Sequence, residues 1–151
     1  MKRLEVRNMT KTYDEGSSTI TALNNVSMEV DAGEIVAIIG PSGSGKSTLL
    51  SAVGALLQPS SGSVIVNGKK IETLKEKELA KFRLNEIGFI LQTSNLIPYL
   101  NVLDQLLLVK KMAGKVSSAD QQFAKQLLAD LGLEKKLKKF DRYFGSDCGA
   151  T

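Results

Sequence analysis

Histidine is absent from the 151-residue sequence, and cysteine occurs once, at Cys148. A single cysteine excludes an internal disulfide framework, because each disulfide joins two thiols. Without histidine, the sequence also lacks the residue on which most acid–base catalysis and many zinc sites depend. These two shortages exclude disulfide-built domains, zinc centres and histidine-based catalysis.

Excess charge and long apolar runs are scarce as well. The net charge of +4 is too small to indicate nucleic-acid binding, so no nucleic-acid partner is expected. No apolar run approaches the ~18 residues that a membrane-spanning helix needs, and residues 1–5 lack the apolar core of a signal peptide. The basic run at 135–139 predicts a solvated helix face, with attraction to an anionic membrane surface as the alternative. We expect a cytosolic protein of one domain, or part of a larger one.

The glycine-rich stretch at residues 40–48 carries the strongest functional signal. It reads Gly-Pro-Ser-Gly-Ser-Gly-Lys-Ser-Thr and matches the phosphate-binding loop pattern G-x-x-x-x-G-K-S/T. Residues 34–39 before it form a nearly unbroken apolar run, which is typical of a buried parallel strand. Apolar residues at helical spacing follow it, so we expect the order strand, loop, helix. The predicted nucleotide-binding residues of this loop are Gly40, Pro41, Ser42, Gly43, Ser44, Gly45, Lys46, Ser47 and Thr48.

The residue types in this loop suit the binding of a nucleotide's phosphates. Glycines allow the main chain to adopt positive φ and to bring several backbone N–H groups close to phosphate oxygens. The following helix directs its positive N-terminal end at the same anion. Lys46 can reach the β- and γ-phosphates, and the hydroxyl of Ser47 can bind Mg²⁺. The sequence therefore predicts nucleotide binding together with Mg²⁺.

The N-terminal half outside this loop reads mainly as strands. Residues 4–7 and 26–30 alternate apolar and polar side chains, as half-exposed antiparallel strands do. The pair Asn67–Gly68 predicts the turn of a hairpin between residues 64–66 and 70–71. This half of the chain is therefore expected to contain an antiparallel sheet.

The second half reads mainly as helices. A short charged helix is predicted at residues 76–83, and a second buried strand at 87–91. Asn101 is expected to cap the next helix, with Asp104 three residues further on. Another helix should run from about residue 119 to a stop at Gly132, followed by a short basic helix at 134–140. The apolar residues expected on one face of the helix before Gly132 are Phe123, Leu127, Leu128 and Leu131.

Three further features, taken with the loop, resemble the nucleotide-binding subunit of ATP-binding-cassette (ABC) transporters. Tyr13, in the sequence Thr-Lys-Thr-Tyr, stands where this family places the aromatic residue that stacks on adenine. Residues 61–68 resemble the family's SGxVxxxG segment. Gln92 matches the family's glutamine loop, whose glutamine contacts Mg²⁺ and links the core to a helical subdomain. The likeness extends from Leu4 to Phe140.

This resemblance implies an α/β phosphate-loop NTPase fold, of which the chain would be the N-terminal part. Residues 1–92 would hold an antiparallel β subdomain and the first part of a parallel-sheet nucleotide-binding core. Residues 93–140 would form an α-helical subdomain, and residues 141–151 a tail outside the family pattern. ATP and Mg²⁺ are the implied cofactors, with Ser47 and Gln92 as the implied Mg²⁺ ligands.

The resemblance also implies that the protein couples ATP binding and hydrolysis to export across the membrane. Residues 78–83 and 95–98 look closest to a branch that drives lipoprotein release, macrolide export or resistance to antimicrobial peptides. The implied partners are a transmembrane permease, which would face residues 93–99, and a second nucleotide-binding subunit, identical or not. Such a protein is peripheral on the cytoplasmic face of the cell membrane.

Beyond Phe140 the sequence departs from the family. The family continues with an LSGGQ-type signature, a Walker B aspartate, a catalytic glutamate and a switch histidine, none of which is recognised here. Residues 144–148 do not match the signature, and Asp147 would bring negative charge toward the partner subunit's γ-phosphate. We expect a chain cut short with an unrelated tail, the alternative being a degenerate signature. Without further core strands, residues 35–39 and 87–91 should have an uncovered edge or face.

Such a chain is expected to bind Mg-ATP weakly and to hydrolyse little or none of it alone. Two other functions stay open. A different phosphate-loop protein, such as a small kinase or GTPase, would need a guanine-reading N-K-x-D stretch or an arginine-rich lid, and neither is recognised. A non-catalytic fragment that binds nucleotide or a transporter subunit without turnover fits the same residues. The transported substrate is not indicated by the sequence.

Overall fold

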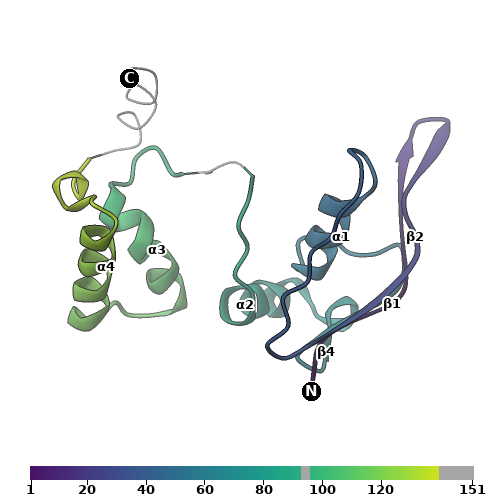
Figure 1. Cartoon of the computed structure of the whole chain (residues 1–151), viewed down its shortest axis with the longest axis horizontal. Coiled ribbons are helices and arrows are strands. Elements are labelled where there is room, and N and C mark those ends of the chain that lie inside the picture. The colour runs from purple at the N-terminus through teal and green to yellow at the C-terminus, as the bar shows by residue number, and fades with distance from the viewer. Residues whose placement is uncertain (93–95, 140–151) are drawn as a thin grey trace. The chain divides into compact units, whose positions relative to one another are not determined.

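The structure is a computed structural model that describes residues 1–92 and 96–139 (Figure 1). The chain divides into two compact units, Met1–Phe89 and Ile90–Thr151. We describe each unit by itself. The division at 1–92, 93–140 and 141–151 that the sequence suggests remains a prediction, and its third part lies outside the described residues.

The first unit is built on a four-stranded antiparallel sheet. Its strands are β1 (Lys2–Glu15), β2 (Ser18–Asp31), β3 (Ser61–Val66) and β4 (Lys69–Lys70), in the order β2-β1-β3-β4. The antiparallel strands predicted near the N-terminus are confirmed, although both are longer than the alternating runs that indicated them. β3 pairs with β1 only between Leu4 and Thr10, so the far end of the β1–β2 hairpin is a two-stranded ribbon (Figure 1).

The turn between β3 and β4 follows the sequence prediction. Asn67 and Gly68 both adopt positive φ, 50° and 76°, as a two-residue hairpin turn with the twist of its strands requires. The side-chain amide of Asn67 donates to Glu86 at 2.8 Å, which ties the turn to a helix of the same unit. Ile71 was expected in the second strand of the hairpin. It instead begins a 3₁₀ turn, η1 (Ile71–Thr73), and its side chain is only 1% exposed.

The two buried strands predicted at residues 34–39 and 87–91 are not formed. The sheet in the described part of the chain is wholly antiparallel, and neither segment belongs to it. An extended segment becomes a stable parallel strand when neighbours satisfy its backbone and other elements cover both faces. Ile35 and Ile90 lack this cover and are 100% and 97% exposed. The uncovered apolar surface expected of these two segments is therefore present at both residues.

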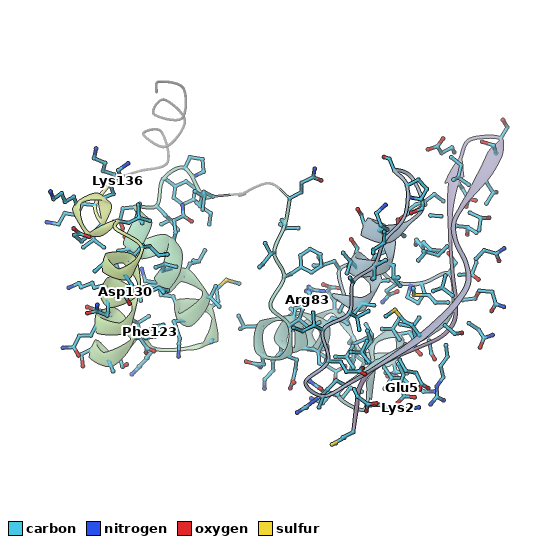
Figure 2. All side chains as sticks on the ribbon, viewed as in Figure 1. Lys2, Glu5, Arg83, Phe123, Asp130 and Lys136 are labelled. Atoms are coloured by element: carbon cyan, nitrogen blue, oxygen red, sulfur yellow. The ribbon has the colours of Figure 1, made fainter. Side chains whose placement is uncertain are left out.

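Two helices cover the sheet of the first unit. They are α1 (Lys46–Val53) and α2 (Glu76–Glu86), and α2 is longer than the predicted helix at residues 76–83. Arg83 of α2, labelled in Figure 2, donates to the backbone oxygen of Ala55 at 2.9 Å and so joins α2 to the turn that follows α1. Because both helices bury apolar side chains against the strands, they complete one core. Its buried members are Val6, Met9, Leu23, Leu49, Ala52, Ala55, Val64, Ile71, Leu79 and Phe82.

The second unit contains two helices with side-chain caps at their N-termini, of which only the cap at Asn101 was predicted. α3 (Val102–Ala113) is capped by Asn101, whose side chain accepts from the backbone N–H of Asp104 at 2.9 Å. α4 (Ser118–Asp130) is capped by Ser117, which forms a capping box with Asp120. Each cap satisfies a backbone N–H that the first turn of the helix leaves unpaired.

Other expectations for the second unit are corrected. Phe123 of α4, labelled in Figure 2, is 70% exposed, whereas Leu128 is buried. The predicted apolar face is therefore only partly covered within this unit. The basic helix predicted at 134–140 is a single 3₁₀ turn, η2 (Glu134–Lys136), and residue 140 lies outside the described part. Within residues 1–92 and 96–139, every helix is too short or too polar to cross a bilayer.

Candidate functional site

The glycine-rich loop joins an extended segment to α1 and is packed against β2. Gly43 and Gly45 adopt φ of 79° and 86°, and Gly45 is the residue that precedes the first turn of α1. A Cβ on Gly45 would come within 2.4 Å of the backbone oxygen of Ala22 in β2. Glycine is therefore required at position 45 both by its backbone conformation and by its close contact with the strand.

Lys46 turns its side chain back across this loop. Its Nζ donates to the backbone oxygens of Gly40 at 2.8 Å and of Pro41 at 2.6 Å, and to Oγ of Ser44 at 3.3 Å. The ammonium group is thereby placed inside the bend of the loop. This position puts a full positive charge beside the N-terminal end of α1, whose helix dipole is also positive there.

A hollow of about 330 Å³ lies at the loop, lined by Ala22 and residues 42–48. No carboxylate lines it, and the first turn of α1 contains no acidic residue. The lining instead offers a lysine, hydroxyl groups and backbone N–H groups, which are the donors that phosphate oxygens accept from. This donor set fits a polyphosphate anion, and Ser47, whose side chain is exposed, fits a ligand of an accompanying Mg²⁺.

Tyr13 lies in the same unit as the loop, on the neighbouring strand. It pairs with Ile20 of β2, and Ile20 is two residues along β2 from Ala22, which the loop contacts. Two residues of a strand span about 7 Å, so the strand position that pairs with Tyr13 is close to the one that the loop contacts. The Tyr13 side chain is 41% exposed, and Lys11 Nζ lies 5.1 Å from the centroid of its ring. An exposed aromatic ring can stack on a flat base.

Gln92 is exposed and belongs to the second unit. The structure does not fix that unit's position relative to the loop, so the Mg²⁺ site predicted from Ser47 and Gln92 together stays a prediction. Residues 93–95 of the segment expected to face a membrane partner lie outside the described residues.

The second unit carries an apolar hollow that the sequence did not single out. Its volume is about 280 Å³, and Gln105 is its one polar lining residue. Gln105 donates to the backbone oxygen of Ile97 at 2.6 Å and accepts from its N–H at 3.3 Å, which holds this segment on α3. The available signal was the excess of leucines around both helices. The lining residues are Leu96, Leu100, Val102, Gln105, Leu106, Leu128, Leu131 and Leu133.

Sequence reasoning also missed two residues that shape the candidate site of the first unit. Ala22 supports the loop through its contact with Gly45, and Lys11 lies against Tyr13. The signal for Lys11 was its place two residues before Tyr13, since alternate residues of a strand share one face. No sequence pattern indicated Ala22, because its contact depends on how the loop packs on β2.

Comparisons with known proteins place this geometry among ATP-binding cassettes. A family model described as "ABC transporter" matches residues 23–146. A relative named "Putative hemin import ATP-binding protein HrtA", from Staphylococcus epidermidis, is 45% identical over 137 residues. A relative of the same name from Staphylococcus haemolyticus is 42% identical over 134 residues. A solved dimeric structure of the ATP-binding cassette MJ0796, in a post-hydrolysis state bound to ADP and Pi, is 37% identical with a TM-score of 0.84.

The alignments cover most of this chain and a smaller share of its relatives. They span 91% of the chain but 61% of the Staphylococcus epidermidis protein, and 89% against 60% for the Staphylococcus haemolyticus protein. The MJ0796 match covers 92% of this chain and 62% of that structure. The predicted fold class, the N-terminal part of a cassette ATPase, is confirmed by this structural match.

Proposed function

The chain belongs to the ABC transporter family, and on this premise we propose that it acts as the ATP-binding subunit of a transporter. The observation that carries the proposal is the position of Lys46 inside a glycine loop whose hollow has no carboxylate. This arrangement favours a polyphosphate over other ligands of similar size. The exposed ring of Tyr13 on the adjoining strand favours a nucleotide over free phosphate.

Each residue would have a separate task in binding Mg-ATP. The backbone N–H groups of residues 42–48 and the N-terminal end of α1 would hold the phosphates, and Lys46 would add a full positive charge. The Ser47 hydroxyl would bind Mg²⁺, which neutralises phosphate charge when it is bound, and Gln92 would be a second ligand. Tyr13 would stack on adenine. Base–aromatic stacking contributes about 1–3 kcal/mol, enough to distinguish ATP from a bare triphosphate.

Hydrolysis would need groups beyond those in the first 140 residues. Phosphoryl transfer depends on positioned charges and on a residue that orients the attacking water. The family's signature, Walker B aspartate, catalytic glutamate and switch histidine are not recognised in this sequence. We therefore infer that the 151-residue polypeptide binds Mg-ATP without sustained turnover by itself. The alternative is a non-catalytic subunit that binds nucleotide or a transporter component.

A permease and a second cassette are the proposed partners, at the cytoplasmic face of the membrane. The dimeric MJ0796 structure supports the second cassette. The apolar hollow around Leu106 and Leu128 of the second unit is a surface that a permease segment could cover. The names of the HrtA relatives favour hemin as substrate and import as direction, whereas the branch resemblance favours export. Because this chain alone is not expected to hydrolyse ATP, the permease is co-expressed with this chain and an intact homologous cassette. The sign of the change in cellular hemin content then distinguishes the two directions.

Isothermal titration calorimetry of the full chain with Mg-ATP tests the central proposal. We expect binding by the unmodified chain and its loss in Lys46→Ala, because the removed ammonium lies inside the loop. Lys77→Ala is the matched control, since Lys77 is an exposed lysine of α2 in the same unit. Equal binding by Lys46→Ala and Lys77→Ala would contradict the proposed site.

A phosphate-release assay on the same samples tests the inference about turnover. We expect release by the unmodified chain to stay at the level of Lys46→Ala. Steady hydrolysis well above that level would show that the 151 residues contain a complete catalytic set. Addition of the chain to an intact homologue should lower that homologue's ATPase activity if the non-catalytic alternative holds.

A further inference from the structure

We propose that Lys11 is a positioning residue for the base of the nucleotide, through its hold on the Tyr13 ring. This inference rests on the proposed function. It deepens that function by assigning a role to a residue outside the phosphate loop. The cation of Lys11 lies 5.1 Å from the centroid of the Tyr13 ring, within the range of a cation–π contact. Lys11 would therefore act on the base only through Tyr13.

The same ammonium group is anchored on its other side. Lys11 Nζ donates to the backbone oxygen of Gln58 at 3.0 Å. One lysine thus connects the aromatic ring to the chain that follows α1. The ring is held between its own strand and this anchored cation, while 41% of the side chain stays exposed for a ligand.

Residues 58–60 brace the strand as well as the side chain. Ser60 Oγ accepts from the backbone N–H of Thr12 at 3.1 Å, and the two hydroxyl oxygens lie 3.2 Å apart. The backbone N–H of Ser60 donates to the oxygen of Thr10 at 2.9 Å. These links join β1, on both sides of Lys11, to the segment that follows the phosphate loop and α1. These hydrogen bonds therefore connect the strand that holds Tyr13 to the segment that contains the phosphate loop and α1, within one unit.

The contact of Lys11 with the Tyr13 ring matters because of where Tyr13 lies in the sheet. β3 pairs with β1 no further than Thr10, so Tyr13 lies on the two-stranded ribbon beyond it. A half-exposed side chain on a ribbon loses rotamer freedom when a ligand orders it, and this loss weakens binding. A cation already seated against the ring reduces that loss, which is the benefit of preorganisation.

The test compares two ligands and two substitutions in the full chain. The ligands are Mg-ATP and magnesium tripolyphosphate, which has the phosphates but no base. Lys11→Met keeps the length of the side chain and removes the charge, whereas Lys11→Arg keeps a cation. We expect Lys11→Met to weaken Mg-ATP binding about three-fold, with tripolyphosphate binding unchanged and Lys11→Arg close to the unmodified chain.

A double-substitution cycle tests whether the effect passes through the ring. In a Tyr13→Ala background, Lys11→Met should cause no further loss of Mg-ATP affinity, because the ring that the cation holds is gone. Circular dichroism and thermal unfolding of each variant establish that it is folded. If Lys11→Met fails to fold, Lys11→Gln replaces it, because this substitution also removes the charge.

Several outcomes would overturn the inference. Equal loss for both ligands would show a merely structural role, and an unchanged Mg-ATP affinity would show none. Tighter Mg-ATP binding by Lys11→Met would show that the lysine occupies the face on which adenine stacks. If the unmodified chain binds neither ligand, the proposed function itself fails, and the inference fails with it. If the unmodified chain binds both ligands but the variants do not show the expected affinities, the inference alone fails.

Discussion

Gly45 approaches the backbone of Ala22 so closely that a Cβ at position 45 would lie 2.4 Å from the Ala22 oxygen. The phosphate loop is therefore seated on β2 of the antiparallel sheet, and the unpaired segment 34–39 before it contributes no strand. Because β2 also pairs with the strand that holds Tyr13, one pair of strands places both ends of the proposed nucleotide site.

This contact predicts different costs for two glycine substitutions in the same loop. Gly43→Ala forces alanine into positive φ, with nothing within 4 Å of the new Cβ, and should lower the free energy of unfolding by about 1–2 kcal/mol. Gly45→Ala adds a backbone collision to the same kind of strain and should cost clearly more. Urea unfolding followed by circular dichroism measures both. A cost for Gly45→Ala no larger than that for Gly43→Ala would show that the loop does not rest on Ala22.

Truncation of two isoleucines of the first unit should change the free energy of unfolding by very different amounts. Ile71 is 1% exposed, and Ile71→Ala should lower the free energy of unfolding by about 2–5 kcal/mol, because it leaves a cavity in the core. Ile35 is fully exposed, and Ile35→Ala should change it by less than about 0.5 kcal/mol. Ile35→Ala should also reduce self-association in light scattering, since it removes exposed apolar surface. A large loss of stability in Ile35→Ala would mean that the Ile35 side chain is packed.

The capping box of α4 predicts an acid-sensitive helix. The hydrogen bond from the Ser117 hydroxyl, then that from the Ser117 backbone N–H and the contact with Lys110, lowers the pKa of Asp120 to about 2. Because the folded pKa lies below the unfolded value of about 3.9, the stabilisation is complete above about pH 4. It is lost as the pH falls through about 2.

Carbon-13 detected titration of the Asp120 carboxyl measures this shift directly. Ser117→Ala should raise the pKa of Asp120 toward its ordinary value, and it should do so more than Lys110→Met, since the hydroxyl contact is the larger cause. The comparison of the Asp120 pKa in Ser117→Ala and in Lys110→Met shows which contact lowers this pKa more. An ordinary Asp120 pKa in the unmodified chain would exclude the capping box in solution.

Local sequence signals predicted those parts of the fold whose structure depends on near neighbours. Asn67–Gly68 formed the turn and Asn101 formed the cap, because both depend on hydrogen bonds or φ angles within a few residues. The helices around them were also found, with errors of a few residues at the ends. The loop at 40–48 was identified because its glycines and lysine are required by the loop's own geometry.

The errors occurred where structure depends on distant partners. Residues 34–39 and 87–91 read as strands because they are apolar, but a strand also needs a neighbour, which the pattern cannot supply. Phe123 has helical spacing with Leu128, yet only Leu128 is buried in its unit. Ala22 joined the candidate site through the packing of the loop on β2, which a single sequence does not reveal.

The links between β1 and the segment after α1 fix the spacing of the two parts of the proposed site. α1 is eight residues long, or about 12 Å, and its two ends lead to the phosphate loop and to the brace at Gln58 and Ser60. With both ends fixed, the spacing between Lys46 and Tyr13 is set before any ligand arrives. A nucleotide would therefore meet a lysine and an aromatic ring that one connected set of strands and helix holds.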